Sequence, residues 1–354
     1  MCPTWPPRYQ LAQRLLSTIV TADGNPTRCT VAFVTRTTSA RPAVEPDDIA
    51  AAVARIRPYV RETPVLDIRA GELGFDHPVT LKLELLQHAG SFKTRGAFNR
   101  VLTAAADGEI GGAGLIAASG GNHGAAVAYV AQQLGLVAEI FMPSTSPAIK
   151  RERIEGFGAR VNVIDGYFDD AQRACVERQV ETGALAIHPF EHPAIIAGQG
   201  TMSVEIDDQV GDYDTLVVAV GGGGFIAGQA AWVQDRRRVI SVEPTTSRCL
   251  HAAREAGQPV PVGVAGVAAD SLGANQLGSL AWTIVDPFVD ESVLVGDDDI
   301  RAAQRSLWDR LRLVVEPGGA AALAALQSGA FTPEPGERVV VAVCGSNCDP
   351  NSVM

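Results

Sequence analysis

Short apolar runs rich in valine and isoleucine alternate along most of the chain with amphipathic segments. Such runs predict strands, and the amphipathic segments between them predict helices. The predicted strands are Val79–Leu83, Leu115–Ala118, Ala138–Met142, Val161–Ile164, Ala184–Ile187, Leu216–Val220, Val239–Val242 and Val339–Val343. The predicted helices begin at Pro46 and at Phe225, or cover Phe92–Ala105, Asn122–Leu134, Pro147–Phe157, Phe168–Glu181, Ile300–Arg310 and Gly319–Gln327.

The strands are continuously apolar instead of alternating between apolar and polar residues. This pattern is typical of parallel sheets that are covered by helices on both faces, so we predict an α/β fold with two open, mainly parallel, twisted sheets. Because no repeat or linker separates them, we expect the two domains to be interleaved. Residues 44–112 and 190–354 form the predicted large domain, 113–189 form a small inserted domain, and 1–43 form a disordered extension or a non-native start.

Composition and charge narrow the classes of function. The 354 residues are 46% hydrophobic and 19% charged, with a net charge of −11. This charge argues against nucleic-acid and anionic-membrane partners, which attract clustered lysine and arginine. No apolar stretch reaches the roughly 18 residues of a membrane helix. Six scattered cysteines without a CxxC pair indicate neither a disulfide framework nor a zinc site, and predict a reducing, cytoplasmic location.

Three turns beside predicted strands carry candidate chemistry. Lys93 follows a Gly-Ser lead-in at a helix start, and a lysine at a fixed position can form a Schiff base with an aldehyde. The backbone N–H groups of Gly221–Gly224 open a helix and suit a phosphate. Ser119–Gly124 suits a carboxylate. Each turn also has a purely structural interpretation: a surface lysine, a close helix contact or a helix cap.

A nicotinamide dinucleotide is the rival ligand of the glycine run. Gly222, Gly224 and Gly228 follow a strand, and Glu243 ends the next one. Their spacing is GxGxxxG, which is a weak match to the dinucleotide fingerprint GxGxxG. Aldehyde capture, a phosphate site and a carboxylate site together are instead what an enzyme dependent on pyridoxal 5′-phosphate (PLP) requires.

Six short motifs occur in the order found in serine/threonine dehydratases. They are Ser91–Ala97, Ser119–Gly124, His188–Phe190 with Gly198–Thr201, Gly221–Gly224, Glu316–Ala320 and Cys344–Asn347. Over about residues 44–349 the chain therefore resembles this family of fold type II (tryptophan-synthase-β-like) PLP-dependent enzymes.

The resemblance implies a role for each motif. Lys93 would carry the cofactor as a Schiff base, Phe92 would lie against its ring, Asn122 would bind the ring hydroxyl, and Cys344 would face the pyridine nitrogen. The phosphate would be held by Gly221, Gly222, Gly223 and Gly224. The substrate carboxylate would be bound by Ser119, Gly120, Gly121 and His123. A homodimer is the assembly that the resemblance implies.

The proposed partner of the pyridine nitrogen favours one reaction. A thiol is a weak acid and leaves the ring nitrogen largely neutral, which favours β-elimination over chemistry that needs a long-lived carbanion. We expect the loss of water from L-threonine or L-serine, giving 2-oxobutyrate or pyruvate and ammonia, with the Lys93 amine as general base. The alternative interpretation of Cys344 is a buried thiol at a strand end.

Departures from the family pattern leave alternatives open. Serine racemases carry a second serine where this chain has Gly120, which favours a dehydratase. Serine racemases also bind a divalent ion through an acid-Pro segment and a second acid six residues later. In this chain Glu243-Pro244 is followed by Cys249 at that second position, so we expect no metal. Glu316 lies near the substrate amine or only caps a helix.

Other activities fit the same motifs. A serine racemase, a lyase for another β-substituted amino acid such as hydroxyaspartate, and a non-catalytic cofactor-binding protein remain alternatives. The chain ends soon after Cys344, so we expect no regulatory domain and no feedback by isoleucine.

Overall fold

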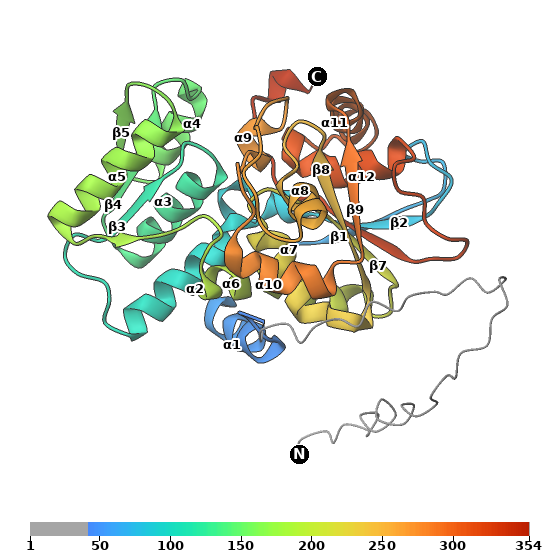
Figure 1. The fold of residues 1–354 in the computed structure, drawn as a ribbon, viewed down its shortest axis with the longest axis horizontal. Coiled ribbons are helices and arrows are strands. Elements are labelled where there is room, and N and C mark those ends of the chain that lie inside the picture. The colour runs from blue at the N-terminus through green and yellow to red at the C-terminus, as the bar shows by residue number, and fades with distance from the viewer. Residues whose placement is uncertain (1–41, 354) are drawn as a thin grey trace, which may run out of the picture. The chain divides into compact units, whose positions relative to one another are not determined.

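The computed structural model describes residues 42–353. All but the last two residues of the predicted N-terminal extension therefore lie outside the described part of the chain. Two sheets organise the described residues (Figure 1). None of the helices within 42–353 is long and apolar enough to cross a membrane.

The larger sheet has six strands in the order β1-β2-β10-β7-β8-β9. β1 pairs with β2 in the antiparallel sense, and every other neighbouring pair is parallel. The strands are β1 Val65–Ile68, β2 Val79–Lys82, β7 Thr215–Ala219, β8 Arg238–Pro244, β9 Glu291–Val295 and β10 Val339–Ala342. β10 lies between β2 and β7, so segments far apart in the sequence end side by side at one edge of the sheet.

The smaller sheet has four parallel strands in the order β5-β4-β3-β6 and is drawn in green in Figure 1. Its strands are β3 Leu115–Ala118, β4 Ala138–Pro143, β5 Arg160–Ile164 and β6 Leu185–Ala186. All four come from one continuous stretch of the chain, between the first and second parts of the larger sheet. The exact domain boundaries at 112/113 and 189/190 stay a prediction.

Helices cover the sheets. They are α1 Pro46–Ile56, α2 Lys93–Ala106, α3 Asn122–Leu134, α4 Ala148–Gly156, α5 Phe168–Thr182, α6 Pro193–Val210, α7 Gly224–Val233, α8 Cys249–Ala256, α9 Ala269–Leu272, α10 Ser279–Phe288, α11 Asp297–Leu311 and α12 Pro317–Gln327. Short 3₁₀ helices are η1 Glu84–Leu86, η2 His88–Gly90, η3 Gln234–Arg236 and η4 Pro350–Ser352.

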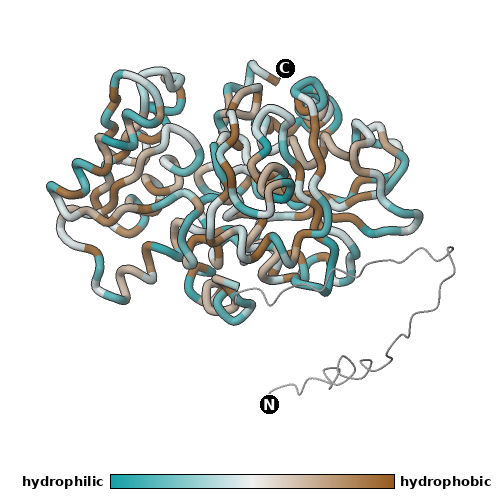
Figure 2. Tube along the Cα trace, in the orientation of Figure 1, coloured by the Kyte–Doolittle hydropathy of each residue, from teal (hydrophilic) through white to brown (hydrophobic). Residues whose placement is uncertain are grey.

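The burial of β3 shows why its apolar run is continuous. Leu115 and Ala117 belong to a core cluster that includes residues of α3, whereas Ile116 and Ala118 belong to another that includes residues of α5. Successive side chains of a strand point to opposite faces, so a sheet covered on both faces needs apolar residues throughout. The predicted α/β architecture with two mainly parallel sheets is confirmed. Hydrophobic residues accordingly concentrate along the strands (Figure 2).

Several elements escaped prediction. The helix α6 contains Gly198 and Gly200 and is buried over most of its length, so it lacks the polar face that reveals a helix. Both glycines are required by close packing, since a Cβ on Gly198 would lie 2.7 Å from the Arg95 carbonyl and one on Gly200 2.7 Å from the Gly228 carbonyl. The edge strands β1 and β9 are short and partly exposed, and the apolar pattern did not predict them. It did not predict α8, α9 and α10 either.

Candidate active site

The first residue of α2, Lys93, is placed by an unusual turn. The loop after β2 passes through Ala89 and Gly90, both with positive φ (56° and 77°), before α2 begins. Gly90 has room only for a hydrogen, because a Cβ there would overlap the side-chain oxygen of Asn347. Ser91, in the same loop, pairs with Gly345 just after β10. The loop therefore places Lys93 beside the carboxyl end of β10.

Burial lowers the pKa of the Lys93 amine. Its Nζ donates a hydrogen bond to the carbonyl of Pro189 over 2.9 Å. Burial lowers the pKa of Lys93 to about 8, although the nearby Cys344 and Glu316 oppose the shift. A larger fraction of this amine is therefore neutral near pH 8 than for an ordinary lysine, as a nucleophile or base requires.

Phe92 is packed on one side by another aromatic ring. Its ring stacks on that of Phe225, with centroids 3.9 Å apart and an angle of 24° between the planes. The Lys93 Nζ lies 5.1 Å from the Phe92 centroid. Phe92 is therefore next to the amine, while its contact with a cofactor ring stays a prediction.

Asn122 and Glu316 meet although they are far apart in the sequence. Asn122 begins α3, and its Nδ2 donates to Glu316 Oε1 over 2.5 Å. Glu316 is buried, and burial raises the pKa of its carboxyl, with Asn122 and nearby cations opposing the shift. Glu316 occupies the N-cap position of α12 without a side-chain cap bond, so the capping interpretation is wrong.

The loop that starts α3 is shaped by its small residues. Ser119 Oγ accepts a hydrogen bond from the Gly121 N–H over 3.2 Å. A Cβ on Gly124 would overlap the Ser119 carbonyl, and one on Gly120 would lie 2.7 Å from Ser146 Oγ. Within residues 42–353 the backbone N–H groups of Asn122 and His123 find no acceptor, and together with the helix dipole they can bind an anion.

The His123 ring is neutral and is hydrogen-bonded to the backbone, so it is not available as a cation for a substrate carboxylate. Its ring is buried, and Nε2 lies 2.7 Å from the carbonyl of Ile187. Burial lowers the pKa of His123 to about 3, with the Lys93 charge acting in the same direction. The neutral ring must place its proton on Nε2 to bind that carbonyl. His123 can therefore offer a substrate its backbone N–H group, whereas the imidazole is committed elsewhere.

The glycine run between β7 and α7 presents a row of backbone donors. Gly223 adopts a positive φ of 90° as the N-cap of α7. A Cβ on Gly222 would overlap the Phe190 ring, and one on Gly224 would lie 2.7 Å from the Phe190 Cβ. No acceptor within the described residues binds the backbone N–H groups of Gly221–Gly224. These groups and the positive end of α7 suit a phosphate.

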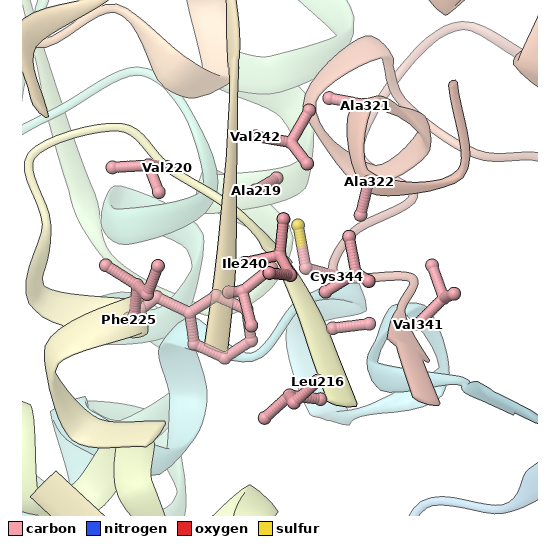
Figure 3. Packing of buried hydrophobic residues seen from close by; sticks show 14 of the residues in the cluster. Leu216, Ala219, Val220, Phe225, Ile240, Val242, Ala321, Ala322, Val341 and Cys344 are labelled. Carbon is pink, nitrogen blue, oxygen red and sulfur yellow. The ribbon is translucent and has the colours of Figure 1, made fainter. Parts of the chain in front are cut away.

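Cys344 follows β10 and is buried at 3% exposure. Figure 3 shows its sulfur among apolar side chains of the large-sheet core. Burial raises the pKa of the thiol, and Glu316 acts in the same direction. The Sγ–H group points to the carbonyl of Gly318 at 3.5 Å. Cys344 is thus held as a neutral thiol beside the site.

Glu243 has a structural task that excludes the dinucleotide role. Its two carboxylate oxygens accept the N–H groups of Leu250 and His251, each over 2.8 Å, at the start of α8. Burial raises the pKa of Glu243 to about 7. Cys249, in the same turn, donates its thiol proton to the carbonyl of Gly221 over 3.1 Å. With both oxygens occupied, Glu243 is not available for a ribose hydroxyl.

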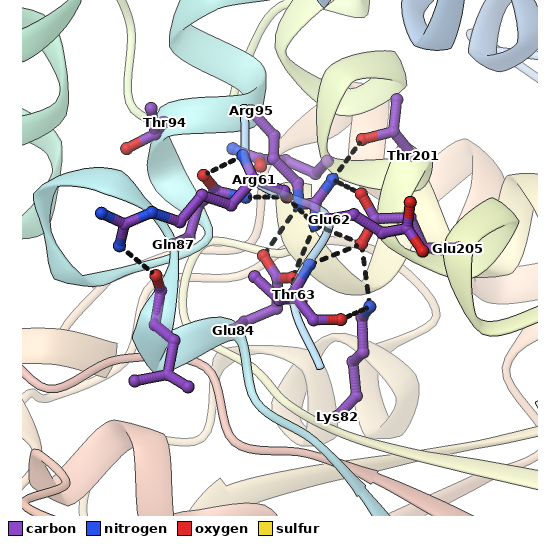
Figure 4. Close-up of polar contacts among 12 residues, drawn as sticks. Arg61, Glu62, Thr63, Lys82, Glu84, Gln87, Thr94, Arg95, Thr201 and Glu205 are labelled. Atoms are coloured by element: carbon purple, nitrogen blue, oxygen red, sulfur yellow. Dashed lines mark hydrogen bonds and ion pairs between the residues drawn. The ribbon is translucent and has the colours of Figure 1, made fainter. Parts of the chain in front are cut away.

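A buried ionic network behind α2 was not foreseen (Figure 4). Arg95 binds Glu84 through Nε and NH2 over 2.8 and 2.7 Å, and Glu205 through NH1 over 2.6 Å. Lys82 Nζ adds a 2.8 Å bond to Glu205. Two positive and two negative charges thus balance in the interior. Two features of the sequence could have indicated this network: Lys82 lies within an apolar strand, and Arg95 follows Lys93 by two positions.

Pyridoxal 5′-phosphate fits this arrangement. The Lys93 amine can bind its aldehyde, the N–H groups of Gly221–Gly224, which have no acceptor within the described residues, can bind its phosphate, and the neutral thiol of Cys344 lies near the amine. No group of three or more histidine, cysteine, aspartate or glutamate side chains suited to a metal occurs among the residues that the structure describes.

Comparison with known proteins agrees with this fit. Residues 56–345 match the model of the family described as pyridoxal-phosphate dependent enzyme. The biosynthetic L-threonine dehydratase of Haemophilus influenzae is 39% identical over 252 residues, which cover 70% of this chain and 49% of that protein. The chain spans about half the length of the threonine dehydratases of this kind that it matches first.

Two relatives are matched along nearly their whole length. The phenylserine dehydratase of Ralstonia pickettii is 37% identical over 307 residues, or 85% of this chain and 92% of that protein. The solved structure of maize serine racemase superposes with a TM-score of 0.81 at 33% identity, covering 87% of this chain and 94% of that one.

Proposed function

Because the chain belongs to the family of pyridoxal-phosphate dependent enzymes, we propose that it is an ammonia-lyase acting on L-threonine or L-serine. Loss of water would give 2-oxobutyrate or pyruvate, with ammonia. The observation that carries the proposal is the buried Lys93 amine, with its pKa lowered to about 8, beside the neutral thiol of Cys344. The N-termini of α3 and α7 supply backbone N–H groups without an acceptor within the described residues. Threonine dehydratases among the relatives support the reaction class.

The proposed roles follow from the surroundings of each residue. When bound, pyridoxal 5′-phosphate supplies an electron-withdrawing ring that makes the substrate α-proton acidic. The Lys93 amine accepts that proton, since its lowered pKa leaves much of it neutral under mildly alkaline conditions. Cys344 keeps its proton because burial raises its pKa, so it would offer the ring nitrogen no anionic partner to keep that nitrogen protonated.

Substrate and cofactor binding are assigned to backbone groups and Asn122. The free N–H groups at the start of α3 bind the substrate carboxylate, beside Ser119, Gly120 and Gly121. Those of Gly221–Gly224 would bind the cofactor phosphate. Asn122 would bind the ring hydroxyl with the Nδ2 hydrogen that Glu316 does not use. The homodimer and the cytoplasmic location expected from the sequence stay predictions.

Measuring 2-oxo acid and ammonia from L-threonine, L-serine, D-serine and phenylserine tests this proposal. We expect products from L-threonine or L-serine, and none from the Lys93→Ala variant, which lacks the amine. Arg151→Ala, which removes an exposed ion pair with Glu155, is the matched control and should keep full activity. Undiminished product from Lys93→Ala would refute the role of Lys93, and equal rates from both serine enantiomers would refute the L-dehydratase.

A serine racemase is the second candidate, and one contact favours keeping it. Gly120 lacks the hydroxyl that racemases carry there, but Ser146 Oγ lies only 2.7 Å from where a Cβ of Gly120 would be. A hydroxyl is therefore available near that position from another segment. Chiral chromatography of the serine remaining after incubation with L-serine decides the question. If the wild-type protein forms D-serine and Ser146→Ala does not, racemisation proceeds through this hydroxyl.

A further inference from the structure

Asn347 lies three residues after Cys344, and both hydrogens and the oxygen of its side-chain amide are hydrogen-bonded. Its Nδ2 donates to the carbonyl of Ala89 over 2.7 Å and to Asn122 Oδ1 over 2.6 Å. Its Oδ1 accepts a hydrogen bond from the guanidinium of Arg153, on α4. One side chain thus connects the loop before Lys93, the first residue of α3, and α4.

These bonds fix the direction of the Asn122 amide. A primary amide has one oxygen that accepts and one nitrogen with two hydrogens. Asn347 presents a donor to Asn122, so Asn122 Oδ1 must face it, and Asn122 Nδ2 must face Glu316. The reverse orientation would place two NH₂ groups against each other and two oxygens against each other. One Nδ2 hydrogen then remains without an acceptor within the described residues.

We infer that Asn347 is the positioning residue of the cofactor site: it orients the Asn122 amide so that an N–H group, and not an oxygen, is offered to the cofactor. The inference rests on the proposed function for the identity of the ligand. Gly90 shows how closely Asn347 is seated, since a Cβ on Gly90 would overlap Asn347 Oδ1. Asn347 is therefore held closely against the loop before Lys93 while its amide faces Asn122.

The near-isosteric variant Asn347→Asp tests the donor separately from the packing. Aspartate keeps an acceptor for Arg153 but sets a carboxylate oxygen against Asn122 Oδ1, which turns the Asn122 amide round. Ser346→Ala is the matched control, because Ser346 bonds the carbonyls of Leu85 and Gly90 in the same loop, each over 3.3 Å. The probe is pyridoxal 5′-phosphate, titrated into apoprotein by its visible absorbance.

We expect Asn347→Asp to raise the dissociation constant of the cofactor at least about tenfold, the equivalent of one hydrogen bond of about 1.4 kcal/mol, and to shift the visible absorbance maximum. Ser346→Ala should change neither quantity. Equal losses in the two variants would show that the loop only needs to be intact, and would overturn the inference. An unchanged dissociation constant and spectrum in Asn347→Asp would overturn it as well.

A double-mutant cycle with Asn122→Ala separates positioning from stability. If Asn347 acts through Asn122, then Asn347→Asp should weaken cofactor binding no further once Asn122 is alanine. A further loss of the same size in that background would contradict the inference. If the wild-type protein binds the cofactor but releases no ammonia from any amino acid, the proposed lyase fails, while the binding cycle still decides the role of Asn347.

Discussion

The protonation states of the side chains at the candidate active site are set mainly by their burial. Lys93, His123 and Cys344 all have pKa values shifted toward the neutral form, and burial is the largest cause for each. Desolvation always disfavours the charged state, so it lowers the pKa of bases and raises that of acids. The site therefore holds a neutral imidazole and a neutral thiol around an amine that titrates in an accessible range.

The pH dependence of cofactor capture follows at the same scale. Only the neutral amine attacks an aldehyde, and the pKa of Lys93 is lowered to about 8, so the rate should rise with pH and reach half its maximum near pH 8. Stopped-flow absorbance of apoprotein mixed with pyridoxal 5′-phosphate measures this rate. A midpoint near the ordinary lysine value of 10.5 would show that burial does not control the amine.

At the scale of elements, α2 is anchored by charge as well as by packing. The Arg95 guanidinium bonds Glu84 on η1 and Glu205 on α6, so two other elements are tied to the helix that carries Lys93 (Figure 4). A buried pair of this kind adds little net stability compared with apolar residues, but losing one partner leaves an uncompensated buried charge.

Substituting Arg95→Met should lower the free energy of unfolding by about 3–5 kcal/mol, because Glu84 then stays buried without its main partner. Urea unfolding of the apoprotein measures the change. The exposed pair of Arg151 and Glu155 is the control, and Arg151→Ala should cost no more than about 0.5 kcal/mol. Equal effects of the two substitutions would mean that the network is not a buried anchor.

At the scale of the whole molecule, residues from both sheets complete the site. Asn122 follows β3 of the smaller sheet, whereas Glu316 precedes α12 and Asn347 follows β10 of the larger sheet. Lys150, on α4, forms an ion pair with Asp270, on α9. The relative position of the two sheets is therefore fixed by polar contacts in the region where a cofactor would bind.

Cofactor binding should be independent of divalent ions. Both carboxylate oxygens of Glu243 already accept backbone N–H groups of α8. Cys249, at the position where a metal site would need a second acid, donates its thiol proton to the carbonyl of Gly221. Dialysis against EDTA should leave the cofactor dissociation constant and the turnover unchanged. A loss of either that Mg²⁺ restores would show that Glu243 exchanges its backbone partners for a metal.

The sequence by itself determined the local order of elements and the residues of the turns between them. The boundaries of β3 and α3 agree with the prediction, because a buried strand and a capped helix are set by residues that are neighbours in sequence. The glycine and lysine turns were recognisable for the same reason. The residues proposed for the site were therefore named before their partners were known.

Only the tertiary structure decided how these side chains are used. Glu316 and Asn122 are 194 positions apart, and Asn347 and Asn122 are 225 apart, so no local pattern relates them. The choice between a capping and a site-facing Glu316, the commitment of the His123 ring and the capping role of Glu243 all depend on such distant partners. Burial and hydrogen-bond direction are properties of the packed interior, and the residues along the chain do not specify them one by one.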